Sequence, residues 1–312
     1  MTASNPKPVR KRRVWLLLIA IPAGLFGLSW YFTEPLADPP ANSVASPPAA
    51  VVASAPAGRA VEPPVDLETP AAWPENKVEG DEAKRILLES AKRTVARLDK
   101  IEAYTSTFRR RERVGGVLGP EITAGLKIRN RPFAIYLKYL APKAGKEVVY
   151  AEGHHDNKVI AHNGDWTRRI VPRLAVAPDS ALALADSRHP VTDAGLWNLG
   201  RKLLRFREMD MGDDDATTTL DRTTGLDGRP LLRSVHTHSK PDDGRPFAHV
   251  EVLYDPETQI PFQISSFDWP DPNHSGPLDL AEQYTYDDLK LNAPLTAADF
   301  DPTNPEYAFM RF

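Results

Sequence analysis

The sequence predicts an α+β domain in which two helices accompany an antiparallel sheet of roughly nine or ten strands. Helical periodicity occurs in two segments, and the rest of the domain alternates apolar and polar residues in two uninterrupted runs. Because strands and helices do not alternate, a doubly wound parallel sheet is excluded. Hydrophobic residues make up 41% of the 312 residues and charged residues 26%, which is enough apolar material for a core.

The first predicted helix starts near Gly80. Asp81 and Glu82 place negative charge in its first turn, where the helix dipole favours it. Its apolar residues recur at spacings of three and four: Leu87, Leu88, Ala91, Val95, Leu98 and Ile101. After Glu102 the pattern alternates, which predicts consecutive antiparallel strands near residues 105–113, 122–128, 133–140 and 146–152.

A second helix interrupts the strands. We expect Thr192 or Asp193 to cap it, because both side chains can accept a hydrogen bond from the first turn. Leu196, Leu199 and Leu203 then share one face of the helix. Strands are predicted to resume near residues 217–223, 231–239, 248–254, 260–267 and 278–289.

The first residues of the chain are predicted to meet a membrane. Residues 1–13 form a basic N-terminus, and residues 14–32 carry no charge. At about 1.5 Å per residue this uncharged stretch spans a hydrocarbon core of roughly 30 Å, which predicts a transmembrane helix. The positive-inside rule places the N-terminus in the cytoplasm. A cleaved signal peptide is the alternative, but cleavage after Ala37 would put Pro35 where a small residue is required.

Residues 33–76 are predicted as a disordered linker, and residues 77–312 as the folded domain outside the cytoplasm. The linker holds 10 of the 30 prolines and 11 alanines, with Trp73 as its one aromatic residue. Such a segment cannot bury enough apolar surface to order itself. Its prolines favour an extended spacer that reaches on the order of 100 Å from the membrane.

Composition and missing motifs exclude several functions. The net charge of −3 gives no field for nucleic acid, so none is expected as a partner. Cysteine is absent, which excludes disulfides, thiolate metal sites and cysteine nucleophiles. The chain also lacks G-x-S-x-G, a Walker loop, G-x-G-x-x-G and H-E-x-x-H. We therefore expect no cofactor and no catalytic residue, and the protein is not expected to be an enzyme.

His236 and His238 are the weak candidates for a metal site. They lie two residues apart in a predicted strand, so their rings share one face. A metal site needs three or four ligands, and no further ligand is evident. The favoured interpretation is two solvent-facing histidines beside Lys240, and no metal is expected.

Arg110 is the candidate polar residue of a binding site. On a strand it shares a face with Tyr104 and Phe108, whereas Arg109 and its alternate neighbours share the opposite, wet face. A cation that points into an apolar face needs a partner. That partner is either Glu112 or another buried acid, in an internal salt bridge, or the anionic or carbonyl head group of a ligand.

Three stretches resemble a bacterial family, domain of unknown function 1571. They are R-P-F-A-I-Y-L-K-Y-L-A-P-K-A-G-K-E-V-V-Y-A-E-G at 131–153, H-P-V-T-D-A-G-L at 189–196 and Y-T-Y-D-D-L-K-L-N-A-P-L-T-A-A-D-F-D-P-T-N-P-E-Y at 284–307. With the helix from Gly80, the resemblance covers essentially the whole folded domain. Membership carries no known activity and implies a bacterial protein. Together with the single predicted membrane helix, it places the folded domain on the periplasmic side of the inner membrane.

The order of elements also resembles the periplasmic lipoprotein carriers of the LolA and LolB type. That resemblance implies an incomplete antiparallel barrel, a half-barrel wrapped around helices, whose concave side receives acyl chains. Alternation along the strands then selects candidate lining residues in addition to Arg110: Phe133, Ile135, Leu137, Tyr139, Phe262, Ile264, Tyr284 and Tyr286. The competing interpretation of each of the apolar candidates is ordinary core packing.

Three functions remain open. The first is non-covalent binding of lipid or lipoprotein acyl chains in a half-barrel cavity, with the membrane, a lipid or a lipidated protein as partner. The alternative is a cell-envelope sensor or interaction module, which would bind an envelope protein in the same groove. The third is a metal-dependent enzyme that uses His236 and His238. We expect the first.

Overall fold

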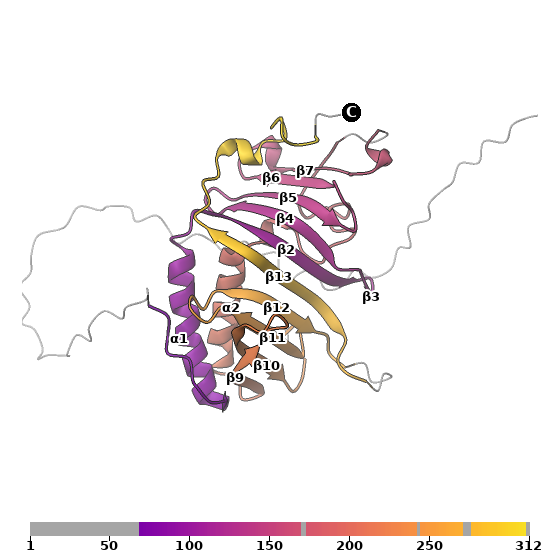
Figure 1. Cartoon of the computed structure of the whole chain (residues 1–312). Coiled ribbons are helices and arrows are strands. Elements are labelled where there is room, and N and C mark those ends of the chain that lie inside the picture. Colours follow the sequence, from indigo (N-terminus) through magenta and orange to yellow (C-terminus); the bar gives the residue numbers. More distant parts are fainter. Residues whose placement is uncertain (1–68, 170–172, 242–243, 271–275, 310–312) are drawn as a thin grey trace, which may run out of the picture. The chain divides into compact units, whose positions relative to one another are not determined.

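The computed structural model describes residues 69–169, 173–241, 244–270 and 276–309 (Figure 1). All of them belong to the second of two units into which the chain divides, Ala53–Phe312. The predicted basic N-terminus, the predicted membrane helix and most of the predicted linker lie outside the described residues. No helix among the described residues combines the length and the apolar composition needed to cross a membrane.

In the described part of the chain, thirteen strands form one antiparallel sheet. Its order is β1-β9-β10-β11-β12-β13-β2-β4-β5-β6-β7-β8, and β3 pairs with β2. The strands are β1 (Val78–Glu79), β2 (Ala103–Val114), β3 (Val117–Leu118), β4 (Ile122–Arg129), β5 (Ala134–Ala141), β6 (Glu147–Ala151), β7 (Val159–His162), β8 (Leu174–Val176), β9 (Ala216–Thr224), β10 (Pro230–His238), β11 (His249–Tyr254), β12 (Pro261–Phe267) and β13 (Leu280–Leu291).

The predicted antiparallel sheet is confirmed, and every predicted strand is present. The two runs of strands join in the middle of the sheet, where the last strand, β13, pairs with the first long strand, β2. In that pair Tyr284 lies opposite Arg110, and Tyr286 opposite Phe108. The order begins at β1 and ends at β8, so the sheet of the described residues is open.

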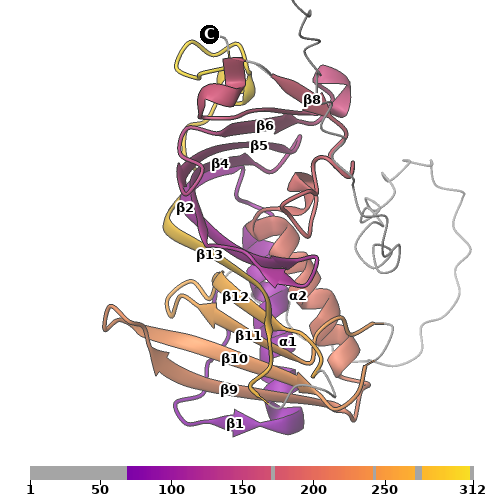
Figure 2. The ribbon, with the colours of Figure 1, turned by 90° about the vertical axis from the view of Figure 1, so that its right-hand side faces the viewer.

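Helix α1 (Gly80–Leu98) and helix α2 (Leu196–Asp210) pack side by side against the half of the sheet that contains β9 to β12 (Figure 2). Gly200 lets the helices approach closely, since a Cβ atom there would lie 2.7 Å from Leu98 Cδ1. Between helices and strands lies the first apolar cluster: Trp73, Ala83, Leu87, Leu203, Leu220, Leu232, Val252 and Tyr254. Trp73 falls within the predicted linker, and its ring lies 5.4 Å from that of Tyr254.

The C-terminal segment, residues 292–309, covers one face of the half of the sheet that contains β4 to β7. It contains the 3-10 turn η4 (Ala297–Phe300) and lies beside β5 and β6 (Figure 1). Tyr307 stacks on Tyr136 of β5 with ring centroids 4.0 Å apart, and Phe309 joins the same buried cluster. Lys127 pairs with Asp299 at 2.7 Å. Because this face is covered, the opposite face of β4 to β7 is the one that remains for a site.

The predicted cap of α2 is wrong. Thr192 and Asp193 lie in a separate 3-10 turn, η3 (Val191–Asp193), and neither side chain caps the helix. The residue at the N-cap is Gly195, with φ of 106°, a region of backbone space that favours glycine. A Cβ atom at this position would lie 3.1 Å from both Ile128 Cδ1 and the Tyr104 hydroxyl, so a second reason for glycine is close packing.

Candidate functional site

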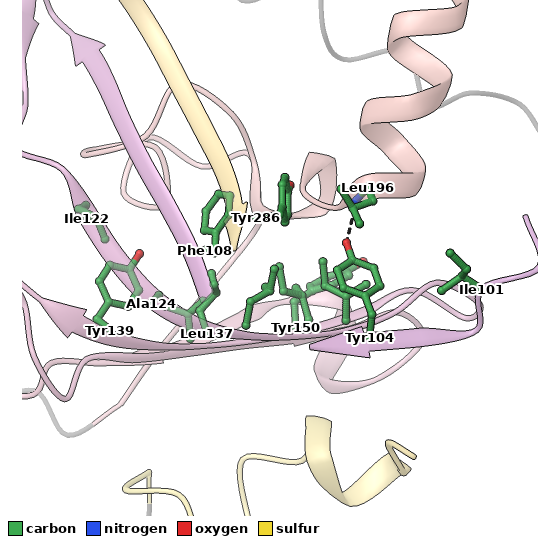
Figure 3. Packing of buried hydrophobic residues seen from close by; sticks show 14 of the residues in the cluster. Ile101, Tyr104, Phe108, Ile122, Ala124, Leu137, Tyr139, Tyr150, Leu196 and Tyr286 are labelled. Atoms are coloured by element: carbon green, nitrogen blue, oxygen red, sulfur yellow. Dashed lines mark hydrogen bonds between the residues drawn. The ribbon is translucent and has the colours of Figure 1, made fainter. Parts of the chain in front are cut away.

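Apolar side chains from six strands cover the face of the sheet that the C-terminal segment leaves free; we call it the inner face. Six of the predicted lining residues lie on it or pack against it: Phe133, Ile135, Leu137, Tyr139, Tyr284 and Tyr286. They meet side chains that the prediction did not include: Tyr104, Phe108, Ile122, Ala124, Leu126, Ile128, Val148, Tyr150 and Val159. Figure 3 shows part of this cluster between the strands and the start of α2. Strand alternation therefore placed these six residues in one contiguous apolar cluster, most of which is buried.

Phe262 and Ile264 are not part of the inner face. Ile264 packs against the cluster under the two helices. The ring of Phe262 lies 4.8 Å from the guanidinium of Arg229. Both residues belong to β12, which lies beyond β13 in the sheet and belongs to the half covered by helices. The structure thus separates these two from the other six apolar candidates.

The start of α2 closes one end of the inner face through two tyrosine hydroxyls. The backbone N–H of Leu196 donates to Tyr104 at 2.7 Å, and that of Gly195 donates to Tyr286 at 3.1 Å. These hydroxyls accept hydrogen bonds from N–H groups that have no partner within the helix. Burial raises the pKa of Tyr286 to about 12, so its hydroxyl stays protonated and neutral. Tyr286 therefore has a structural role at this end.

A buried polar network lies at the other end, around Arg110. The Arg110 guanidinium donates to Glu112 at 2.7 Å. It also donates to the Ser187 hydroxyl at 2.6 Å and to the Asp186 carbonyl at 3.1 Å. The first contact matches the internal salt bridge that the sequence suggested for Arg110. The other two contacts tie it to a segment more than seventy residues away in the chain.

Two buried carboxylates face each other across β2 and β13. Glu282 is the direct cross-strand neighbour of Glu112, and such like-charged pairs are unfavourable unless they are compensated. Glu112 accepts a hydrogen bond from Tyr284 at 2.5 Å. Glu282 contacts His189 at 2.8 Å and Arg188 at 3.2 Å.

The pKa of Glu282 shows how the pair is compensated. Burial is the largest influence on this pKa and would raise it, but His189 and Arg188 outweigh burial and hold the pKa below its usual range. Glu282 is therefore charged at neutral pH. Both residues that compensate it come from the segment over the inner face.

Residues 177–190, which we call the cover segment, lie over the end of the inner face that Arg110 occupies. None of them is fully buried. The segment is held largely by charge: Asp186 pairs with Lys143 and lies 3.7 Å from Lys146. Burial opposes the charge of Asp186, but Lys143 and Lys146 outweigh it and lower the pKa of this carboxyl. The cover segment is thus attached by polar contacts and not by an apolar core of its own.

The expectation that His236 and His238 face solvent is wrong, because α2 covers their strand. His236 lies within hydrogen-bond reach of Thr218 and Ser234, and Arg207 contacts its Nε2 atom. Burial, followed by the charge of Arg207, holds the pKa of His236 well below its usual value, so this ring is neutral.

Asp210 is the acid at the centre of this second cluster, which we call the Asp210 cluster. Its carboxylate lies 3.1 Å from Arg207 and 2.9 Å from Arg245, and it approaches His236 and His238 at 3.7 and 3.6 Å. Two arginines therefore already supply the positive charge next to the acid. Within the described parts of the chain, no group of three His, Asp or Glu side chains is arranged to hold a metal ion.

Sequence reasoning missed Tyr104, Glu282, Asp186 and His189 as parts of the site. The sequence pattern could have identified Glu282, since strand alternation places it on the same face as Tyr284. His189 lies in one of the stretches that suggested the family. For Asp186 no signal was available, because its contacts with β5 and β6 depend on how a long loop folds back.

Several solved structures are similar to this chain at low identity. The lipoprotein LppX of Mycobacterium tuberculosis is 16% identical, with 69% of this chain and 98% of that one covered and a TM-score of 0.38. A putative outer membrane lipoprotein-sorting protein domain from Vibrio parahaemolyticus is 9% identical, with coverage of 69% and 95% and a TM-score of 0.32. A LolA superfamily protein from Nitrosomonas europaea is 10% identical, with coverage of 68% and 97% and a TM-score of 0.26.

No curated protein matches the sequence. The model of one protein family does match, over residues 101–309, and its description is "Protein of unknown function (DUF1571)". The match covers the inner face, the cover segment and the C-terminal segment, and it confirms the resemblance suggested by the sequence. The chain belongs to the DUF1571 family.

Proposed function

We propose that this domain binds an acyl chain, from a lipid or a lipidated protein, non-covalently against the inner face and beneath the cover segment. One observation carries the proposal: a contiguous cluster of buried apolar side chains is covered at one end by a segment that has no fully buried residue and is held by charged groups. Displacing such a segment breaks polar contacts that water can replace. The apolar surface beneath it would then need an apolar occupant.

Burial of apolar area provides the driving force for this binding. Each buried methylene group of an acyl chain contributes about 0.8 kcal/mol, so contact with a few inner-face side chains suffices for affinity. Leu137 and Tyr139 lie on the strand whose hairpin carries Lys143, which holds the cover segment. They are the first inner-face residues that an incoming chain would meet.

Arg110 is the group that would recognise the polar end of the ligand. Its bond to Glu112 stays within β2, whereas its bonds to Ser187 and Asp186 depend on the cover segment. When that segment moves away, two donor directions of the guanidinium become available to a carbonyl or an anionic head group. Glu112 would keep the cation oriented.

The setting that we propose is the periplasmic side of the bacterial inner membrane. Its support is the uncharged stretch of residues 14–32, the basic residues before it and the proline-rich residues that follow. A tether of this kind would keep the domain within reach of lipid and of lipidated proteins, while preventing it from diffusing away.

Photocrosslinking of the full chain tests the proposal. Membranes that contain the protein would be supplied with a phospholipid bearing a diazirine on its acyl chain, irradiated, and analysed by peptide mass spectrometry. We expect adducts on alternate residues of β5, at Ile135, Leu137 and Tyr139, because these face inward. Tyr136 and Lys138 on the other face are the internal control. Adducts confined to residues 1–76, or equal on both faces of β5, would contradict the proposal.

A charge swap tests the role of the cover segment. Asp186→Lys places a third cation beside Lys143 and Lys146, and we expect it to increase labelling of the inner face. Asp186→Lys combined with Lys143→Asp restores an opposite-charge pair at the same place, and we expect it to return labelling towards the original level. If both variants label like the original chain, acyl chains do not enter beneath this segment.

A further inference from the structure

Large apolar side chains are exposed mainly at one end of the sheet. Seven large apolar residues of the described parts are exposed. Six of them lie at this end, with relative exposures of 71% for Val117, 52% for Leu140, 69% for Trp166, 58% for Leu182, 36% for Met209 and 41% for Met211. The seventh, Leu226, is 112% exposed and lies at the opposite end. The strand register places the β2–β3 and β5–β6 hairpins, the end of β7 and the start of β9 at this end. The β9–β10 hairpin with Leu226 turns at the other end.

Three of these side chains form what we call the apolar rim: Leu140 near the end of β5, Trp166 after β7 and Leu182 in the cover segment. The loop that carries Trp166 packs tightly on the β5–β6 hairpin, since a Cβ atom on Gly164 would lie 2.0 Å from the carbonyl of Ala144. The hairpin in turn holds the cover segment through the pair Lys143 and Asp186. The apolar rim therefore follows the outer edge of the cover segment.

Basic side chains accompany the apolar rim. Lys143, Arg169 and Arg173 are exposed on the adjoining loops, and Lys138 is exposed on β5. The acids of this region are fewer: Asp165 accepts hydrogen bonds from Thr167, Asp186 pairs with Lys143 and Lys146, and Asp179 is exposed. The region thus has an excess of positive charge around exposed Trp and Leu.

We infer that the apolar rim docks on a bilayer surface that contains anionic phospholipid. Tryptophan prefers the interface between head groups and acyl chains, and exposed leucines on loop tips gain by entering it. Lysine and arginine beside them are attracted to anionic head groups. A protein partner would match the apolar side chains equally well, but the excess of basic groups favours phosphate. This docking does not depend on the acyl-chain binding proposed above.

Docking would act directly on the cover segment. Lys143 holds Asp186, and lipid phosphate near the apolar rim competes for the same ammonium group. Leu182 belongs to the cover segment itself and would enter the bilayer with Trp166. A lipid surface would therefore weaken the attachment of the cover segment at the place where its acyl chains are available.

The chain contains no cysteine, so single-cysteine variants of the full-length protein test the docking directly. Trp166→Cys, Leu140→Cys and Leu226→Cys would each carry a fluorophore, with the protein reconstituted in vesicles of phosphatidylcholine with or without phosphatidylglycerol. Leu226→Cys is the matched control, because Leu226 is equally apolar, fully exposed and at the opposite end. The measurement compares quenching by a lipid-borne nitroxide with quenching by iodide in water.

With phosphatidylglycerol, we expect the nitroxide to quench labels at positions 166 and 140 strongly and the label at 226 weakly. Raising the ionic strength should reduce that difference, because salt screens the head-group attraction. Arg169→Gln in the Trp166→Cys background should lower the ratio of docked to undocked label about fivefold, as expected for the loss of one basic charge near an anionic surface.

Two results would overturn the docking. The first is equal quenching of the labels at 166 and 226 by the nitroxide in vesicles with phosphatidylglycerol. The second is a label at 166 that neither quencher reaches, which would show that a protein surface covers the apolar rim. Neither result bears on the photocrosslinking of Leu137 and Tyr139, so failure of the docking and failure of acyl-chain binding are distinguishable.

Discussion

Ion pairs hold the Asp210 cluster together and also attach the cover segment, and the two sets of ion pairs differ in burial and in what they join. In the Asp210 cluster, a carboxylate of α2 with 1% side-chain exposure pairs with Arg245 of the loop between β10 and β11 and approaches His236 and His238 of β10. At the cover segment, Asp186 has 37% side-chain exposure and joins a loop to a hairpin. Burial of the first makes it costly to open, and exposure of the second lets water replace the contact.

The two sets of ion pairs also differ in the apolar packing around them. Helix α2 packs an apolar face on the strands beside the Asp210 cluster, so the charges there add to an existing core. The cover segment has no fully buried residue, and its charges are its main attachment. Ion pairs therefore reinforce the packed helix α2 in one half of the domain, whereas in the other half they are the main attachment of a segment that can be released.

The largest effect is expected from Asp210→Ala. Removal of the carboxylate leaves Arg207 and Arg245 buried side by side without their shared acid, which should lower the free energy of unfolding by about 3–5 kcal/mol. Chemical denaturation would measure it. Asp214→Ala, in the exposed turn just after α2, is the matched control and should change stability by less than about 0.5 kcal/mol. Similar effects for the two variants would show that the Asp210 cluster is not a structural joint.

Gly195→Ala should give the next largest effect. Alanine would have to adopt φ of 106°, and its Cβ atom would lie 3.1 Å from Ile128 Cδ1 and from the Tyr104 hydroxyl. Together these should cost about 1–3 kcal/mol of stability. Gly212→Ala, where a Cβ atom would meet nothing within 4 Å, serves as the control in the same denaturation experiment. Equal stability of the two variants would contradict the close packing at the start of α2.

His236→Gln should change the dependence of stability on pH. The folded-state pKa of His236 is lowered by burial and by Arg207, whereas the unfolded chain binds the proton near pH 6.5, about the ordinary value. The stabilisation by the neutral ring is therefore complete above about pH 6.5 and declines as the pH falls below it. Unfolding free energies measured between about pH 5 and 7 should fall less steeply in the variant. An unchanged slope would mean that the ring is accessible to protons in the folded state.

Asp186→Asn should have the smallest effect on stability, below about 1 kcal/mol, because the carboxylate is partly exposed. Burial opposes its charge, but Lys143 and Lys146 lower its pKa. The contribution of the ion pair is thus present above the ordinary pKa of about 3.9 and lost as the pH falls through the lower folded-state value. Hydrogen exchange of residues 177–190 should nevertheless become faster. Asp179→Asn, in the same segment, should leave that exchange unchanged.

Local features of the fold were predictable because they depend on neighbouring residues. The spacing of Leu87 and Leu98 predicted α1, and alternation placed Arg110 on the inner face and Arg109 on the wet face. Alternation tells which residues share a face, but not what lies over that face. His236 and His238 do share a face, as expected, yet a helix covers it.

Features that join distant parts of the chain were not predictable. Phe262 and Ile264 follow the same alternation as Leu137 and still lie over the other half of the sheet, because strand order decides which core a face meets. Tyr286 was predicted as a lining residue and Tyr104 only as a member of an apolar strand face, and the structure uses both hydroxyls at the start of α2. No local pattern records such a contact between residues about ninety positions apart.

The pairing of β13 with β2 has a consequence for how the domain is made. Because β13 is synthesised after the other described strands, the two runs of strands stay unjoined until Leu291 has been made. Up to that point β2 presents an unpaired strand edge, of the kind that associates with other chains. A chain that stops before β13 would therefore lack the strand that joins the two halves of the sheet, and not merely an edge strand.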